Sequence, residues 1–237
     1  MLNEGGFCTE SDIFSAPGGD ALWLVYKAKA PDRIFAQEVT VVPADLSPVS
    51  VVGTGTPPRF RLQPAGPAVQ LIAADQPWEN KCVEAPWVVV DAPQRSASSR
   101  TYMYLFYAAD WDKKSKPPDH KAIGVARSKS GLLGPWEKRP LPILHSSPNY
   151  TAATLADTAW RISPGHCSVI PSGPANGSWA IVYHSSLISD GGTVPGPREM
   201  MMDSLVWGED GWPSVDGGTG VPSQTPRTAP QAAVAGR

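Results

Sequence analysis

The feature of this sequence that most limits its fold is a unit that occurs three times. The three copies begin at Glu10, Glu84 and His166. Each copy starts with an ionisable residue, enters a short apolar run, crosses a turn rich in Gly, Pro, Ser or Asn, and returns as a stronger apolar strand. The return strands are expected at residues 21–27, 101–109 and 178–185. Repeated β units pack around an axis, so we expect the three starting residues to converge on one place.

The rest of each unit predicts an all-β fold. Helical periodicity is almost absent, and 26 Pro and 22 Gly residues separate short runs of β-branched and aromatic residues. Third strands are expected at residues 33–41, 121–130 and 198–207, and a fourth, irregular segment at residues 68–73 and 136–144. Four antiparallel strands per unit are typical of a propeller blade.

The domain boundaries follow from the number of units. Residues 1–212 contain about three blades, which do not close a ring, so we expect an incomplete propeller that lacks about two blades at its N-terminal side. Residues 213–237 are rich in Gly, Pro, Ser, Thr and Ala and predict a disordered tail. Because open flanks expose apolar strands, we expect residues 1–237 alone to be poorly soluble.

Charge and hydropathy exclude two classes of partner. The net charge is −2, the pI is about 6.1, and no basic run is present, which argues against nucleic acid. The longest apolar runs have the length of a strand, far below the roughly 20 residues of a membrane helix. Nine Trp residues are compatible with stacking on sugars, although packing within the core and the blades is the favoured explanation.

Cysteines and sequons bear on the compartment. Cys8, Cys82 and Cys167 each lie within two residues of the start of a unit, and a Cys8–Cys82 bridge is compatible with secretion, but the pairing stays open. The sequons at Asn149 and Asn176 favour a secretory route. The first ten residues contain no signal peptide, so we expect secretion for a longer parent protein.

Two carboxylates and one imidazole are the candidate chemical groups. Glu84 lies in CVEAPWVVVD with almost no neighbouring charge, so we expect burial to raise its pKa and suit it to general acid catalysis. A capping or ion-paired glutamate is the structural alternative for Glu84, and a core histidine is the alternative for His166. With Glu10 at the equivalent repeat position, the pair favours glycoside hydrolysis. Arg198 opens a strand and could bind a sugar hydroxyl or a carboxylate.

Several motifs in series resemble glycoside hydrolase family 43. They are VEAPWVVVD, TYMYLFYAADW, AIGVARSKSGLLGPWEK, PGHCSVI, WAIVYHS and REMMMDSLVWGEDGWP, and together they cover roughly residues 8–215. The resemblance implies a five-bladed β-propeller. It also implies an inverting glycosidase that acts mainly on α-L-arabinofuranosyl or β-D-xylosyl linkages of plant polysaccharides or oligosaccharides.

The resemblance also implies roles for single residues. Glu84 corresponds to the general acid of a Glu-x-Pro motif, and Glu10 to a residue, usually Asp, that tunes and orients that acid; Asp12 is a less favoured substitute. His166 matches an axial histidine that often lies beside a calcium ion or its water shell. Arg198 matches a substrate-contacting arginine, and Trp87 is expected to bind substrate. The general base of the family is an Asp on the first blade, which this chain does not contain.

Three functions remain open from the sequence. The first is a glycosidase whose remaining blades lie upstream, the second is a non-catalytic carbohydrate-binding remnant, and the third is a structural propeller. We expect no required cofactor other than an optional Ca²⁺ on the propeller axis. The expected partner is a polysaccharide or oligosaccharide, and we expect a monomer for the full-length protein.

Overall fold

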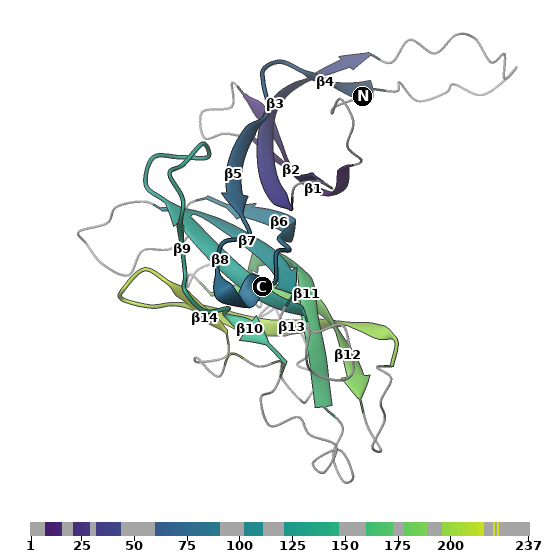
Figure 1. Ribbon diagram of the computed structural model, residues 1–237, viewed down its shortest axis with the longest axis vertical. Helices are drawn as coiled ribbons and strands as arrows, with labels where there is room; N and C mark the ends of the chain where they lie inside the picture. The colour runs from purple at the N-terminus through teal and green to yellow at the C-terminus, as the bar shows by residue number, and fades with distance from the viewer. Residues whose placement is uncertain are drawn as a thin grey trace, which may run out of the picture.

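The computed structural model describes most of the three repeated units. It covers residues 8–15, 21–28, 32–43, 60–90, 102–110, 121–146, 160–172, 178–188 and 196–215, with residues 220 and 222, and gives only the backbone of residues 8–10, 160 and 188. The described residues form three antiparallel sheets that follow one another along the long axis of the molecule (Figure 1). The expected all-β fold of propeller type is confirmed.

The first sheet has five strands, and β1 forms its inner end. The strand order is β1-β2-β3-β4, and β5 also pairs with β3. The bounds are β1 Cys8–Ser15, β2 Leu22–Ala28, β3 Arg33–Pro43, β4 Phe60–Pro64 and β5 Val69–Ala73. The pairs β1–β2 and β2–β3 are antiparallel. The first unit is therefore the up-and-down sheet that its repeat predicts.

The second sheet begins after a single 3₁₀ turn, η1 (Pro77–Glu79). Its order is β10-β8-β7-β6, with β9 paired to β8. The bounds are β6 Glu84–Val89, β7 Met103–Asp110, β8 Lys121–Ser128, β9 Glu137–Lys138 and β10 Leu144–His145. The irregular fourth segment of this unit thus forms two short strands, β9 and β10, which both pair with β8.

The third sheet has the order β11-β12-β13-β14. Its bounds are β11 Trp160–Pro171, β12 Trp179–Ile188, β13 Arg198–Trp207 and β14 Pro213–Val215. Strand β14 occupies the first three residues of the segment predicted as a disordered tail. These residues, Pro213 to Val215, pair with the end of β13. The third unit therefore extends past the predicted boundary at residue 212, and residues 223–237 lie outside the described residues.

The pattern of side chains follows the position of each sheet in the stack. Strand β7 (MYLFYAAD) is buried on both faces, because the second sheet lies between the first and the third. Strand β13 (REMMMDSLVW) alternates between buried and exposed positions from Met201 onward, as expected for a sheet covered on one face. The three consecutive methionines therefore belong to a half-buried strand.

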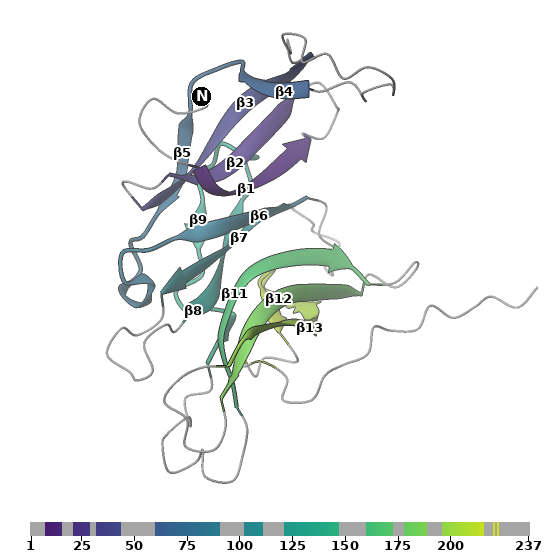
Figure 2. The same ribbon diagram turned by 90° about the vertical axis from the view of Figure 1, so that its right-hand side faces the viewer.

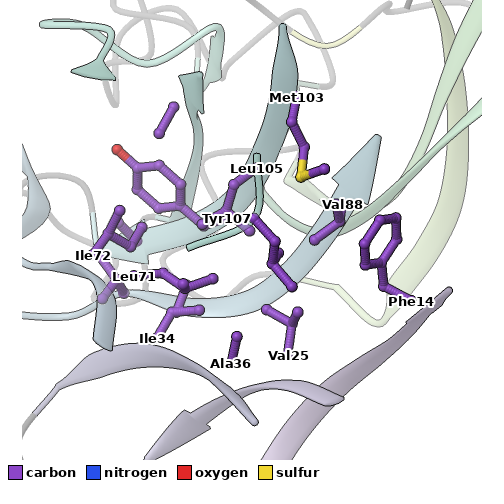
Figure 3. Close-up of a cluster of buried hydrophobic side chains, with 14 of the residues drawn as sticks. Phe14, Val25, Ile34, Ala36, Leu71, Ile72, Val88, Met103, Leu105 and Tyr107 are labelled. Carbon is purple, nitrogen blue, oxygen red and sulfur yellow. The ribbon is translucent and has the colours of Figure 1, made fainter. Parts of the chain in front are cut away.

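Two apolar clusters hold the three sheets together. Figure 3 shows Phe14, Val25 and Ile34 of the first sheet packed toward Val88 and Leu105 of the second. The second cluster joins the second and third sheets. It includes Tyr104, Phe106, Ile181, Tyr183 and Trp207. The rings of Tyr104 and Trp207 lie 4.4 Å apart between centroids, so aromatic packing contributes to this second seam.

The first strand of the second unit meets the first strands of both neighbouring units. Strand β6 contacts both β1 and β11, as the side view in Figure 2 illustrates. The first strands of the three units are therefore neighbours, as predicted. Glu84 begins β6 as expected, but His166 lies within β11 and not at its start. Within the described residues, no helix is long and apolar enough to span a bilayer.

Candidate functional site

A β-bulge interrupts each innermost strand near the predicted site residues. In β6 the register moves from the pair Glu84–Ala108 to the pair Trp87–Phe106, so two residues of β6 face one residue of β7. In β1 residues 9 and 10 face one residue in the same way, and β11 has two such places, at residues 163–164 and 166–167. Bulges redirect side chains and often lie near functional sites.

The bulges place the three predicted starting residues differently in their strands. The residues paired just before a bulge are Cys8 in β1, Glu84 in β6, and both Ile162 and Gly165 in β11. Glu10 and His166 lie inside bulges, whereas Glu84 precedes one. Ala85, Ser163 and His166, each the first residue of its bulge, have positive φ values of 49°, 56° and 49°. The sequence could not reveal the bulges, because an added residue leaves the apolar pattern recognisable.

Glu84 lies at the seam between the first and second units, where two lysines bind it. The ammonium group of Lys27 on β2 lies 3.0 Å from Oε2 of Glu84. The ammonium group of Lys121 on β8 lies 2.5 Å from Oε1. The Glu84 side chain is 18% exposed, and the two lysines are 13% and 15% exposed. Both carboxylate oxygens are therefore engaged by cations in a half-buried place.

Further charges surround this pair of contacts. Lys121 also binds Asp110 at 2.7 Å, and Lys27 lies 3.7 Å from the more exposed Asp32. The thiol of Cys82 lies 3.6 Å from Oε2 of Glu84. Two cations thus face three carboxylates in this cluster, and Lys121 is held more firmly than Lys27.

The expected rise of the Glu84 pKa is wrong for this structure. Burial acts to raise the pKa of Glu84, but hydrogen bonds and ion pairs with Lys121 and Lys27 outweigh it and lower the pKa from 4.5 to about 2. Burial, followed by the nearby Glu84 carboxylate, raises the pKa of the Cys82 thiol to about 11. At neutral pH the cluster therefore holds a carboxylate and a neutral thiol. The two lysines lie 57 and 37 residues from Glu84 in the sequence, so no local pattern indicated them.

His166 and Glu10 lie on the neighbouring innermost strands. His166 is exposed in the second bulge of β11, and the preceding residue, Gly165, approaches the site from the third unit. A Cβ atom added to Gly165 would lie 3.4 Å from Cβ of Lys121. The backbone of Glu10 lies in the bulge of β1, and its side chain lies outside the described residues. The convergence of Glu10 with Glu84 therefore stays a prediction.

Trp87 and Arg198 occupy different environments. The indole N–H of Trp87 donates to the carbonyl of Val169 at 3.1 Å, so Trp87 joins the second unit to the third. Arg198 is the exposed first residue of β13, aligned through Ser186 with Ile162 of β11. Arg198 thus lies two strands out from the innermost strand. Their expected roles in substrate binding stay predictions.

Asp12 joins the first two units instead of lining the bulge. Its Oδ2 accepts the backbone N–H of Val88 on β6 at 3.0 Å. Burial raises the pKa of Asp12 although backbone hydrogen bonds from Val88 and Ile13 oppose the rise. Asp12 therefore has a structural partner four residues along β6 from Glu84.

The remaining site expectations concern thiols, glycans and metal. Cys82 and Cys167 are free thiols, so Cys82 makes no disulfide in this structure. Both predicted sequons lie outside the described residues. Among the residues that the structure describes, no three His, Cys, Asp or Glu side chains gather closely enough to hold a metal ion. The calcium site expected at His166 stays a prediction.

The fold is of propeller type, and comparison with known proteins specifies the family. The family model for glycosyl hydrolases family 43 matches residues 61–213, more than half of the chain. The chain therefore belongs to glycosyl hydrolase family 43. No curated protein sequence matches the chain.

Solved structures of glycosidases share the fold at low sequence identity. A xylan β-1,4-xylosidase from Bacillus halodurans C-125 is 21% identical with a TM-score of 0.62, and the match covers 97% of this chain and 36% of that one. An α-L-arabinanase from Cellvibrio cellulosa, solved with arabinohexaose, is 16% identical with a TM-score of 0.51, and the match covers 87% and 56%. The chain thus spans between about a third and just over half of these structures.

Proposed function

We propose that this chain is part of a glycoside hydrolase that acts on arabinose- or xylose-containing plant polysaccharides or oligosaccharides. Family membership supports the reaction class, and the names of the similar structures support the pentose substrate. The observation with the most weight is the position of Glu84. It opens an innermost strand within the family's Glu-x-Pro motif, at the seam of two units and beside the third.

The proposed mechanism is inverting and uses two carboxyl groups. Glu84 donates a proton to the leaving glycosidic oxygen, while a base carboxylate on the opposite face of the sugar activates water. We propose that the base belongs to sequence outside this chain. Glu10 orients Glu84, and His166, Arg198 and Trp87 contact the sugar. A calcium ion beside His166 would order that side of the site.

A second candidate function is a non-catalytic carbohydrate-binding module. The observation that favours it is the engagement of both Glu84 oxygens by lysines, because a general acid must present a protonated oxygen to its substrate. In this alternative the same surface binds pentose chains without cleaving them.

The remaining parts of the proposal concern cellular context. We propose that the whole protein is secreted, because plant polysaccharides lie outside cells, and that it is a monomer with a carbohydrate partner. We propose neither a nucleic-acid nor a membrane partner, in keeping with the net charge of −2.

Chemical rescue distinguishes the two candidate functions. The 237-residue chain is mixed with aryl α-L-arabinofuranosides and β-D-xylosides, with and without azide. Azide attacks the anomeric carbon in place of the base-activated water, and the phenol leaves with the proton from Glu84. We expect a glycosyl azide of inverted configuration only when azide is present. Glu84→Gln should slow this reaction about 10²- to 10⁴-fold for poor leaving groups and less for good ones.

The control variant is Glu137→Gln, which alters an exposed glutamate of the same unit and should leave the azide reaction unchanged. Binding of pentose oligosaccharides without any glycosyl azide would support the binding module. Neither binding nor azide product would contradict both candidate functions.

A further inference from the structure

We propose that Lys27 and Lys121 form a clamp that withholds the proton-donating form of Glu84, and that Glu84 acts only after Lys27 moves away. This inference deepens the proposed function, since the donor role of Glu84 belongs to it. The lysines are positioning residues in this account, because they act on the sugar through Glu84.

The geometry of the carboxylate is the first argument. A carboxylic acid donates through one oxygen, which must carry the proton and point at the leaving group. In this structure Oε1 of Glu84 faces Lys121 at 2.5 Å and Oε2 faces Lys27 at 3.0 Å. The Cys82 thiol also approaches Oε2 at 3.6 Å. Neither oxygen is available to a glycosidic oxygen while both lysines remain in place.

The second argument identifies the lysine that moves. Lys121 has a second firm partner, since Asp110 lies only 2.7 Å away and is aligned with it across β7 and β8. The other partners of Lys27 are Asp32, at 3.7 Å and with 42% of its side chain exposed, and the neutral Cys82 thiol at 3.8 Å. Exposed ion pairs at such distances contribute little. Lys27 can therefore leave Glu84 at a lower cost than Lys121.

The two lysines come from different units, so the clamp depends on how those units pack on each other. Lys27 belongs to the first unit, whereas Lys121 and Glu84 belong to the second. A change in the spacing of these units separates Lys27 from Oε2 and leaves the contact with Lys121 intact. A bound sugar at this seam could produce the same separation by placing hydroxyl groups between Lys27 and Glu84.

The test is the titration of Glu84 in the full 237-residue chain. ¹³C-labelled glutamate carboxyl groups are followed by NMR from neutral to acid pH, and the Glu84 resonance is assigned as the one lost in Glu84→Gln. Lys27→Met and Lys121→Met should each raise the titration midpoint by about 1 to 3 pH units, the usual effect of one adjacent cation. Lys121→Arg, which keeps the charge, should retain the low midpoint.

The matched control is Lys129→Met, the same change at an exposed lysine that lies over Tyr102 instead of Glu84. Lys27→Gln replaces Lys27→Met if the latter does not fold. Unchanged midpoints in folded Lys27 and Lys121 variants would overturn the clamp. Oligosaccharide binding by the wild type, measured by calorimetry, tests the proposed function separately. Raised midpoints in the lysine variants without sugar binding support the clamp and contradict the proposed function. Sugar binding with unchanged midpoints supports the proposed function and contradicts the clamp.

Discussion

Glu79 and Glu84 lie five residues apart and both bind lysine, but their surroundings differ in kind. Glu79 is fully buried, and its carboxylate accepts the backbone N–H groups of Asp75 and Gln76 at 2.8 and 2.9 Å. The Tyr107 hydroxyl and the Lys138 ammonium complete its shell at 2.8 and 2.7 Å. Glu84 is 18% exposed, and its carboxylate contacts the side chains of Lys27, Lys121 and Cys82.

This difference separates a structural carboxylate from one that can change partners. Backbone donors are fixed by η1 and the turn before it, so Glu79 cannot leave its site without disrupting the chain around it. Lysine side chains have several rotamers and can move while both units stay folded. One short segment therefore carries a structural carboxylate, Glu79, with fixed partners, and a second carboxylate, Glu84, whose partners can move.

The largest expected effect on the free energy of unfolding comes from a change at Glu79. Glu79→Gln leaves the Lys138 side chain, only 5% exposed, without its principal counter-charge. Breaking a buried ion pair in this way typically costs about 3 to 5 kcal/mol. We expect that loss in the free energy of unfolding measured with urea. Glu137→Gln, which removes an exposed partner of Arg127, should cost less than about 1 kcal/mol. Equal losses for the two variants would remove the distinction.

The next effect is the pH dependence due to Glu84. Its pKa is about 2 in the folded protein against an ordinary value of 4.5. Because the folded pKa is depressed, the stabilisation by Glu84 is fully present above pH 4.5 and is lost as the pH falls toward 2. The amount is on the order of 3 kcal/mol. The difference in unfolding free energy between wild type and Glu84→Gln should shrink over this range, and a constant difference would contradict the ion pairs.

A smaller effect is expected from a change at Gly124, which should disturb the surroundings of Glu79 but not those of Glu84. A Cβ atom at Gly124 would lie 2.5 Å from Cζ of Tyr107, the ring whose hydroxyl binds Glu79. Gly124→Ala should therefore destabilise the chain by about 1 to 3 kcal/mol, the usual cost of overpacking. The titration of Glu84 should stay as in the wild type. A shift in the Glu84 midpoint would mean that the two carboxylates are coupled through the strands between them.

The smallest expected effect is at the second seam. The Arg127 guanidinium lies 4.6 Å from the Tyr102 ring and 4.0 Å from the Trp212 ring, between the second and third units. Arg127→Met should cost about 1 kcal/mol in unfolding free energy. Urea unfolding of Arg127→Met and the wild type at neutral pH checks this cost.

The sequence predicted the strands well because strand patterns are local. The second strand of the third unit was expected at residues 178–185 and occurs at Trp179–Ile188, and the third strand was predicted at its observed bounds, Arg198–Trp207. Strand β14 was missed, because a short Pro-Ser-Val segment has no apolar periodicity and becomes a strand only by pairing with β13.

The site was less predictable than the fold. The sequence identified Glu84 and its place on an innermost strand, but its pKa depends on Lys27 and Lys121, which are distant in the chain. Both lysines lie at strand ends, and only the packing of one unit on another brings them together. The packing of the second unit on the third engages the indole of Trp87, which the sequence indicated as a sugar contact.

The central claim is that sugar binds where the three innermost strands meet, around Glu84. The most direct test is an NMR titration of the ¹⁵N-labelled chain with xylo- and arabino-oligosaccharides. We expect the largest amide shifts at Glu84, Lys121 and His166, which belong to β6, β8 and β11. Shifts confined to other surfaces, or none at saturating sugar, would contradict the claim.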